Sequence, residues 1–347
     1  MKLLILQFLR GWAAIIVVAY HAHGVIIKRH VELGAEHSFW FTENQFVKIG
    51  AIGVDIFFIL SGFIIFYTSR NSFDVILYLK KRAVRIYPIW FIAILFMTVL
   101  ALLPGSSAVF DLEHIFYSSL LIPHIYDGAI VPFLKVGWTL NYEIIFYLLF
   151  APTLYFSSSK RLEIITVMIV CLSIISHFLS ENIGVIRLLQ NPILFEFLIG
   201  GWLAKLYLTG FNISKKLMYL VSTFGLLWLG LYFFTPYIWE YNSLISRAPI
   251  ALSIFIVSIF YTPIRNIKIK KSFVYLGDAS YSIYLFHMFP IMILSGVLGR
   301  NLIPQVVMLP TFLVWLIITA GSVLFGCIIY NIIEKKINIR LKEYVSK

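Results

Sequence analysis

Residues 6–24 read LQFLRGWAAIIVVAYHAHG, an apolar run that contains Arg10 and His21. The run is long enough for a helix to cross a bilayer, which takes about 20 predominantly apolar residues. At about 100° per residue, Arg10 and His21 lie on one helix face, roughly 16 Å apart along the axis. Ionisable residues within a membrane segment usually face the interior of a helix bundle or a water-filled cavity. The stretch therefore predicts a transmembrane helix whose polar face is turned into a bundle.

Each of the two residues has a simpler explanation when it is taken alone. Arg10 could snorkel to the cytoplasmic interface, and His21 could be a hydrogen-bonded core histidine. Their shared face, together with the polar groups described below, favours a functional site.

The composition excludes a soluble protein. Of the 347 residues, 61% are hydrophobic and 13% are charged. The hydropathy pattern predicts an all-α, polytopic membrane bundle of about ten transmembrane helices, with a short interfacial helix near 110–122. The expected spans are 4–27, 50–68, 83–103, 137–156, 163–180, 192–208, 215–235, 245–262, 273–297 and 306–333. We expect a single membrane domain over 1–347 with no appended soluble domain.

The net charge of +12 is explained by topology and not by nucleic-acid binding. With the N-terminus inside, 21 of the 28 lysines and arginines fall in cytoplasmic segments. The seven exceptions are Lys28, Arg29, Lys48, Lys135, Arg187, Arg247 and Arg300. This positive-inside bias predicts that both termini are cytoplasmic.

The two cysteines give no sign of metal or disulfide chemistry. Cys171 and Cys327 both fall inside expected spans, where a free cysteine behaves as a small core hydrophobe. Neither a CxxC motif nor a Cys/His metal spacing occurs, so no metal is expected.

Two carboxylates are expected at a depth similar to that of His21, in the outer half of the membrane. Asp55 lies in GAIGVDIFFILSGFII (50–65), and Glu143 lies in VGWTLNYEIIFYLLF (136–150). A carboxylate beside an imidazole fixes the tautomer and stabilises the imidazolium, so this set suits general-base catalysis.

Arg82 and Arg85 open the third expected span at its inner end, in LKKRAVRIYP (79–88). They are three residues apart and therefore neighbours on one helix surface. Arginine suits phosphate binding because it can form paired hydrogen bonds. A donor with phosphates inside and a reactive thioester near the midplane, such as acetyl-CoA, would fit both groups. Taken alone, the two arginines would be ordinary positive-inside anchors.

Other polar residues carry weaker signals. Glu196 also lies within an expected span and has no assigned role, while His23 and His177 are expected to be structural or interfacial. The late segment LGDASYSIYLFH (276–287) places Asp278 at the cytoplasmic start of the ninth span. Residues expected to line the substrate path are Trp138, Tyr147, Tyr284 and His287.

At these positions the chain resembles the acyltransferase 3 family of bacterial integral membrane acyltransferases, in its exopolysaccharide/O-antigen O-acetyltransferase branch. The resemblance rests on the Arg10–His21 spacing, GVDIFFILSGF, the Arg82/Arg85 pair, VGWTLNYEIIFY and LGDASYSIYLFH. It implies transfer of an acetyl group from cytoplasmic acetyl-CoA to a hydroxyl of an extracytoplasmic or lipid-linked polysaccharide. It implies His21 as the catalytic residue and Arg10, Arg82 and Arg85 as essential basic residues that bind acyl-CoA.

The expected reaction is direct transfer, with His21 as the base and Asp55 or Glu143 assisting it. An acyl-histidine intermediate is the alternative. The expected partners are acetyl-CoA, a glycan acceptor and membrane lipid, and the expected location is the bacterial inner membrane. The rival interpretation is a glycan transporter or flippase that uses the same charges as a substrate path. The sequence does not identify the acceptor; the outer loops at 28–48 and 104–135 are the segments expected to select it.

Overall fold

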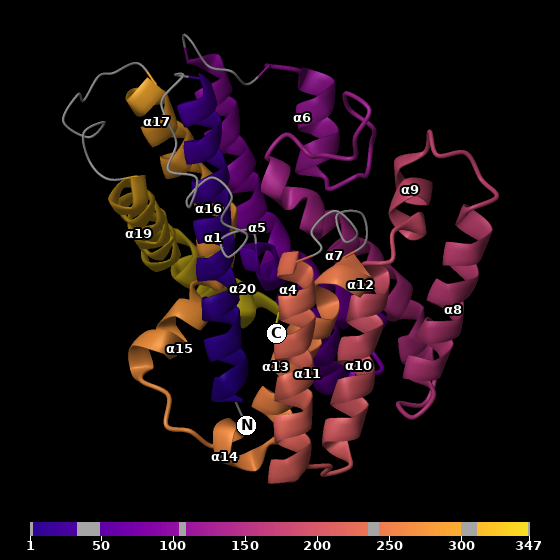
Figure 1. The fold of residues 1–347 in the computed structure, drawn as a ribbon. Helices are drawn as coiled ribbons and strands as arrows, with labels where there is room; N and C mark the ends of the chain where they lie inside the picture. Colours follow the sequence, from indigo (N-terminus) through magenta and orange to yellow (C-terminus); the bar gives the residue numbers. More distant parts are fainter. Residues whose placement is uncertain (1–2, 33–48, 104–108, 235–242, 300–310, 346–347) are drawn as a thin grey trace. The chain divides into compact units, whose positions relative to one another are not determined.

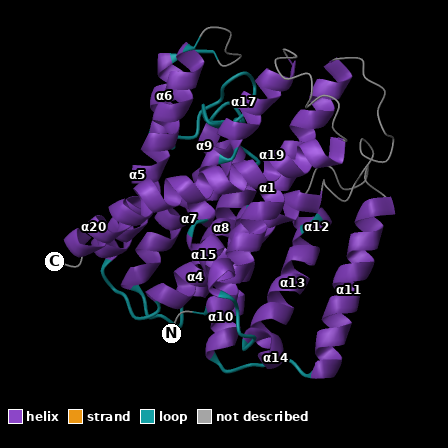
Figure 2. Cartoon of the chain, turned by 90° about the vertical axis from the view of Figure 1, so that its left-hand side faces the viewer, coloured by secondary structure: helices purple, strands orange, loops and turns teal. Residues whose placement is uncertain are grey.

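The computed structural model describes residues 3–32, 49–103, 109–234, 243–299 and 311–345 (Figure 1). Within these ranges the chain forms helices, turns and loops and no β-strand (Figure 2). The prediction of an all-α fold is confirmed. The outer loop expected at 28–48 lies largely outside the described residues, as does part of the loop expected at 104–135.

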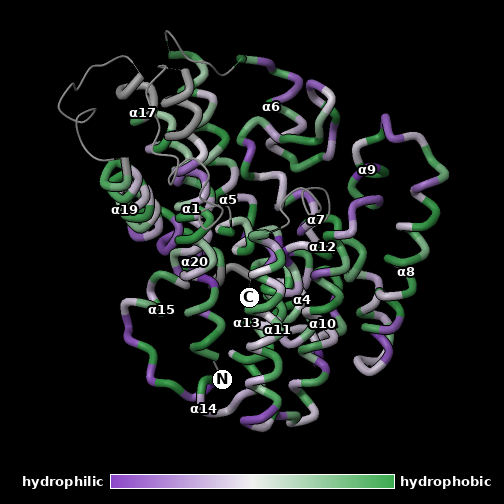
Figure 3. Tube along the Cα trace, in the orientation of Figure 1, coloured by the Kyte–Doolittle hydropathy of each residue, from purple (hydrophilic) through white to green (hydrophobic). Residues whose placement is uncertain are grey.

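Among the described residues, five helices are long and apolar enough to cross a membrane, by length and composition. They cover Leu4–Gly24, Ile49–Ser69, Val75–Leu102, Lys215–Phe234 and Phe312–Leu341. Apolar residues follow the helices and hydrophilic residues gather where helices end, as between α14 (Thr262–Arg265) and α15 (Lys271–Asp278) in Figure 3. The count of ten spans and the cytoplasmic termini stay predictions.

The chain divides into two compact units, which are described separately. The first consists of Met1–Phe57, Ser214–Tyr241 and Ile245–Glu334. The second consists of Phe58–Ile213, Asn242–Leu244 and Lys335–Lys347. The expectation of one membrane domain over 1–347 stays a prediction.

In the first unit, α1 (Leu4–Glu32) packs against four later helices. These are α15, α16 (Ser280–Phe286), α17 (Met288–Gly299) and α19 (Thr311–Ile329). The unit also holds the 3-10 turn η1 (Ile49–Ala51), the first turns of α4 (Ile52–Ser69), α11 (Lys215–Phe234), α13 (Ala248–Phe260), α14 and the π-helical turn Tyr330–Glu334. The short helix α12 (Ser243–Ser246) ends in this unit.

Glycines allow α1 to approach its neighbours at backbone distance. A Cβ on Gly53 would lie 2.5 Å from the carbonyl oxygen of Ala13, and one on Gly277 would lie 2.0 Å from that of Gln7. Both distances are too short for a real Cβ, so a larger residue would push the helices apart. These glycines hold α4 and α15 against α1.

The ninth predicted span, 273–297, is three short helices rather than one. α15, α16 and α17 are separated at Ala279 and at His287. Pro290 explains the second break, because proline lacks the N–H and its ring clashes with the carbonyl four residues earlier, at Phe286. The break places His287 at the junction of α16 and α17.

The second unit is built on α5 (Val75–Leu102), α7 (Trp138–Phe150) and α10 (Leu194–Leu208). It also contains the rest of α4, α6 (Leu112–Ser119), η2 (Lys135–Gly137), η3 (Ala151–Tyr155), α8 (Arg161–Ser176), α9 (Gly184–Gln190) and α20 (Lys335–Val345). The interfacial helix expected near 110–122 corresponds to α6.

The third predicted span begins too late in the sequence. α5 starts at Val75, eight residues before the predicted start at 83, because Asp74 caps its first turn and accepts a hydrogen bond from the Leu77 N–H at 2.8 Å. Arg82 and Arg85 therefore lie inside the helix, and not at its beginning.

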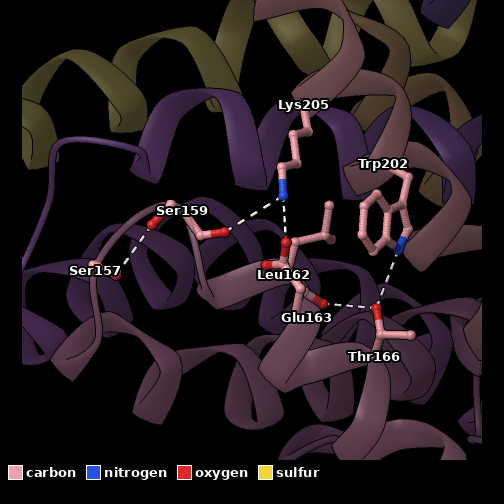
Figure 4. A network of polar contacts seen from close by, with 7 residues as sticks. All are labelled: Ser157, Ser159, Leu162, Glu163, Thr166, Trp202 and Lys205. Atoms are coloured by element: carbon pink, nitrogen blue, oxygen red, sulfur yellow. Dashed lines mark hydrogen bonds and ion pairs between the residues drawn. The ribbon is translucent and has the colours of Figure 1, made fainter.

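Two side-chain networks connect helices of the second unit. Between α8 and α10, Lys205 forms an ion pair with Glu163, and Trp202 Nε1 donates to Thr166 Oγ1 at 3.2 Å (Figure 4). Arg161 is buried and donates to the carbonyl oxygens of Ser69 at 2.6 Å and Leu154 at 3.3 Å. Arg161 therefore supplies hydrogen bonds to backbone carbonyls at the C-terminal end of α4 and in the turn η3. Its expected position among the cytoplasmic charges did not indicate this structural role.

The two cysteines differ in exposure. Cys327 is buried, as expected, and packs with Ala14, Val18 and Ile283. Cys171 is exposed on α8, so its predicted place in the core is wrong. An apolar helix exposes one face to its surroundings, and hydropathy alone does not say which face that is.

Candidate functional site

His21 lies in α1, and its ring is held by a second histidine. His287 Nε2 is 3.0 Å from His21 Nδ1, and the two ring centroids are 5.0 Å apart. His287 is fully buried at the α16–α17 junction. The residues are 266 positions apart in sequence, and they meet because α1 packs along α16 and α17. His287 was expected to line the substrate path, and the structure places it against the ring of His21.

Asp55 is committed to a different partner. Its carboxylate accepts a hydrogen bond from Arg247 Nε at 3.1 Å, and the side chain is 1% exposed. Arg247 is one of the seven basic residues expected outside the cytoplasmic segments, and the ion pair with Asp55 gives it a structural role. We expected Asp55 to assist His21, but in this unit its carboxylate is paired with Arg247.

Glu143 forms a hydrogen-bonded cluster on α7 in the second unit. Tyr147 donates to its carboxylate from one turn further along the helix, and Ser61 donates at 3.3 Å. Arg82 lies over the Tyr147 ring, with its Cζ 5.5 Å from the ring centroid. Arg85 also interacts electrostatically with Tyr147.

This cluster corrects one expectation about depth. We predicted Glu143 in the outer half of the membrane and the two arginines at the inner face. Within the second unit, Arg82 and Glu143 instead contact the same tyrosine. The physical reason is the early start of α5, which carries Arg82 about 10 Å along the helix from Val75.

Two donors in this cluster are buried without a hydrogen-bond partner among the described residues: Tyr78 Oη and Arg82 Nε. Tyr78 is 3% exposed, and the Arg82 guanidinium lies 5.3 Å from the centroid of its ring. Buried polar groups in native structures usually have partners, so these two donors are able to bind an oxygen atom of water or of a ligand. Tyr78 carried no sequence signal beyond its place one turn before Arg82.

The remaining predicted residues are placed as follows. Trp138 packs edge-on against Phe58 and Tyr142. Tyr284 is buried and contacts Phe57 and His287. Arg10 is half-buried on α1, beside Gly11, which touches the backbone of α15.

Two carboxylates outside the predicted site also have partners. Glu196 is buried and accepts from Ser243 Oγ at 3.2 Å, which supplies the polar contact that the sequence left unassigned. Glu334, in the π-helical turn, accepts from the buried Ser282 at 2.5 Å.

A histidine pair that the sequence did not single out joins α6 to the loop that follows it. His114 Nδ1 is 2.7 Å from His124 Nε2, and the His114 ring stacks on Tyr126 with centroids 3.8 Å apart. Burial, with a contribution from His124, lowers the pKa of His114. Among the described residues no group of three or more His, Cys, Asp or Glu is placed to hold a metal ion.

Comparison with known proteins identifies the class of protein. The acyltransferase 3 family model, described as an acyltransferase domain, matches residues 3–331. The chain therefore belongs to the acyltransferase 3 family, and it carries the membrane-length apolar helices described above.

Two relatives are informative. The chain is 30% identical over 263 residues to the "Exopolysaccharide production protein ExoZ" of Rhizobium meliloti, covering 71% of this chain and 78% of ExoZ. It is 25% identical over 328 residues to the "O-acetyltransferase OatA" of Staphylococcus aureus, covering 83% of this chain and 50% of OatA. The chain thus spans about half the length of OatA. No solved structure matches.

Proposed function

We propose that this protein is a multi-pass inner-membrane O-acetyltransferase that moves an acetyl group from cytoplasmic acetyl-CoA to a polysaccharide hydroxyl on the extracytoplasmic side. The observation that carries the proposal is the hydrogen bonding of the His21 ring in a chain that belongs to the acyltransferase 3 family. Its Nδ1 is engaged by His287, while its Nε2 has no side-chain hydrogen bond among the described residues. An imidazole held in this way is suited to accept a proton.

In the proposed reaction, His21 removes the proton from the acceptor hydroxyl as the oxygen attacks the thioester carbon. The C–S bond breaks, the ester forms on the glycan, and the coenzyme A thiolate takes up the proton from His21. General-base assistance of this kind contributes about 10²–10⁴-fold. Direct transfer moves the acetyl group once, from the thioester to the glycan. With an acyl-histidine intermediate the group would move twice, first to His21 and then to the glycan.

The donor phosphates are assigned to Arg10, Arg82 and Arg85. The buried donors Tyr78 Oη and Arg82 Nε support an oxygen-rich ligand at the second unit's cluster. Arginine is well suited to phosphate because its donors can bind two oxygens at once. Glu143 and Arg82 both contact Tyr147, and Glu143 is proposed to help orient Arg82 through this shared partner.

The test uses inverted inner-membrane vesicles, which supply the native acceptor and expose the cytoplasmic face. Vesicles carrying the wild type are given labelled acetyl-CoA, and base-labile label is measured in the polysaccharide fraction. We expect labelling with the wild type and a loss of about 10²-fold or more with His21→Ala. His177→Ala, at an exposed position after α8, is the control. If wild-type vesicles label no better than vesicles without the protein, the acetyltransferase assignment fails and the transporter interpretation replaces it.

A further inference from the structure

His287 has a fixed arrangement of hydrogens that follows from its surroundings. Its Nδ1 lies 2.6 Å from the carbonyl oxygen of Tyr284 and 3.2 Å from that of Ile283. A carbonyl oxygen can only accept, so Nδ1 must carry the hydrogen. In a neutral imidazole the other nitrogen, Nε2, then holds the lone pair. Because the ring is fully buried at a helix break, it has little freedom to turn away.

The same reasoning determines which ring nitrogen of His21 carries the hydrogen. His287 Nε2, an acceptor, lies 3.0 Å from His21 Nδ1. Two lone pairs cannot form a hydrogen bond, so His21 Nδ1 must carry a hydrogen and donate it. The carbonyl of Val17, one turn earlier in α1, also hydrogen-bonds to His21 and fits that assignment. Neutral His21 therefore keeps its lone pair on Nε2.

We propose that His287 is a positioning residue, which fixes the tautomer of His21 so that Nε2 is the nitrogen that accepts the proton. The inference rests on the proposed function, since it assigns a purpose to His287 at the same site. The fixed chain runs from His21 Nδ1–H to His287 Nε2 and from His287 Nδ1–H to the Tyr284 carbonyl. When His21 takes a proton on Nε2, both of these hydrogen bonds remain, and His287 neither gains nor loses a hydrogen.

This arrangement assigns to a neutral histidine the task expected of a carboxylate. A buried acceptor at the second nitrogen holds the ring in the catalytic tautomer and orientation, and stabilises the imidazolium that forms. In this unit Asp55 forms an ion pair with Arg247, and His287 is the side chain that contacts Nδ1 of His21.

The first experiment reads the tautomer directly and does not depend on activity. The full-length protein, labelled with ¹⁵N in its 8 histidines and placed in lipid, is compared with the His21→Ala variant to assign the His21 signals. We expect a proton on Nδ1 and none on Nε2 at neutral pH. A proton on Nε2 of wild-type His21 would overturn the inference, whatever the enzyme assay shows.

The second experiment compares variants in the vesicle assay. His287→Ala should lower kcat about 10- to 100-fold with little change in the KM for acetyl-CoA, since it removes an orienting partner and not a binding group. His287→Gln should restore most of the rate, because its amide oxygen can accept from His21 Nδ1. His287→Asn, whose amide is too short to reach, should not. His23→Gln, another buried histidine in α1, should keep both kcat and KM.

The outcomes separate the two proposals. Equal rates for Gln, Asn and Ala at position 287, with the His21 tautomer unchanged, would reject the positioning role while leaving the acetyltransferase intact. A wild type that transfers no acetyl group, yet shows the expected tautomer, would reject the function and leave the hydrogen-bond assignment in place.

Discussion

Arg247 neutralises a carboxylate that is otherwise closed off from water. Asp55 is 1% exposed, and Arg247 Nε lies 3.1 Å from its Oδ2. Removing one partner of a buried pair leaves an uncompensated charge, whereas replacing both with apolar residues removes the problem.

We therefore expect Arg247→Met to destabilise the protein by about 3–5 kcal/mol. The double variant Asp55→Leu/Arg247→Met should recover most of that loss. Thermal unfolding in detergent measures both. Lys205→Met is the matched control, because its ion pair with Glu163 is 36% and 45% exposed and should contribute about 0–1 kcal/mol. Equal losses from the single and double variants would show that Asp55 does not depend on Arg247.

His114 gives a pH dependence outside the membrane-spanning helices. Burial lowers its pKa in the folded state below the value of about 6.5 for an unfolded chain. As the pH falls through that range, the unfolded chain binds the proton first, so stability is present above about pH 6.5 and is lost below it. The hydrogen-exchange protection of residues 112–133, taken relative to the intrinsic exchange rate at each pH, should be lower at pH 5.5 than at pH 7.5. His114→Gln should remove much of the difference, and an unchanged difference would contradict the assignment.

At the scale of elements, helices α4 and α10 are in backbone contact. A Cβ on Gly62 would lie 1.9 Å from the Phe197 carbonyl oxygen, and one on Gly200 would lie 2.0 Å from that of Ile59. The two glycines face each other's helices, so the contact is reciprocal. Neither backbone can yield without moving a whole helix.

Gly200→Ala should therefore destabilise the protein by about 1–3 kcal/mol through overpacking. Gly321→Ala in α19 is the control, because a Cβ there meets nothing within 4 Å. Alanine favours helices over glycine, so the control should be neutral or more stable by up to about 1 kcal/mol. Melting temperatures of the two variants beside the wild type test the comparison. A Gly200→Ala protein as stable as the wild type would contradict the tight crossing.

The elements also show where hydropathy was sufficient. The apolar runs around α1, α4, α5 and α11 are each one helix, because a long uninterrupted run has no other way to satisfy its backbone in lipid. The run at 273–297 was also predicted to be one span but breaks into three helices. Pro290 was visible in it, yet the consequence for His287 depended on where α1 lies.

At the scale of the whole molecule, the positive-inside bias predicts both termini in the cytoplasm. In a background without Cys171 and Cys327, Asp127→Cys should react with an impermeant maleimide in intact cells. Asn266→Cys, beside Arg265 and Lys268, should react only after permeabilisation. Maleimide labelling of the wild-type protein, which still contains Cys171 and Cys327, measures the background reaction of these two cysteines. The reverse pattern would invert the topology and with it the side on which the donor binds.

The sequence alone determined the class of fold, the family and the residues worth testing, because these depend on composition, period and local motifs. Arg10 and His21 share a face through helix geometry, and Arg82 lies beside Arg85 for the same reason. The tertiary structure decided the partners. His21 meets His287 across 266 residues and Asp55 meets Arg247 across 192. Those contacts follow from how helices pack, and packing depends on many small fits that no single stretch of sequence contains.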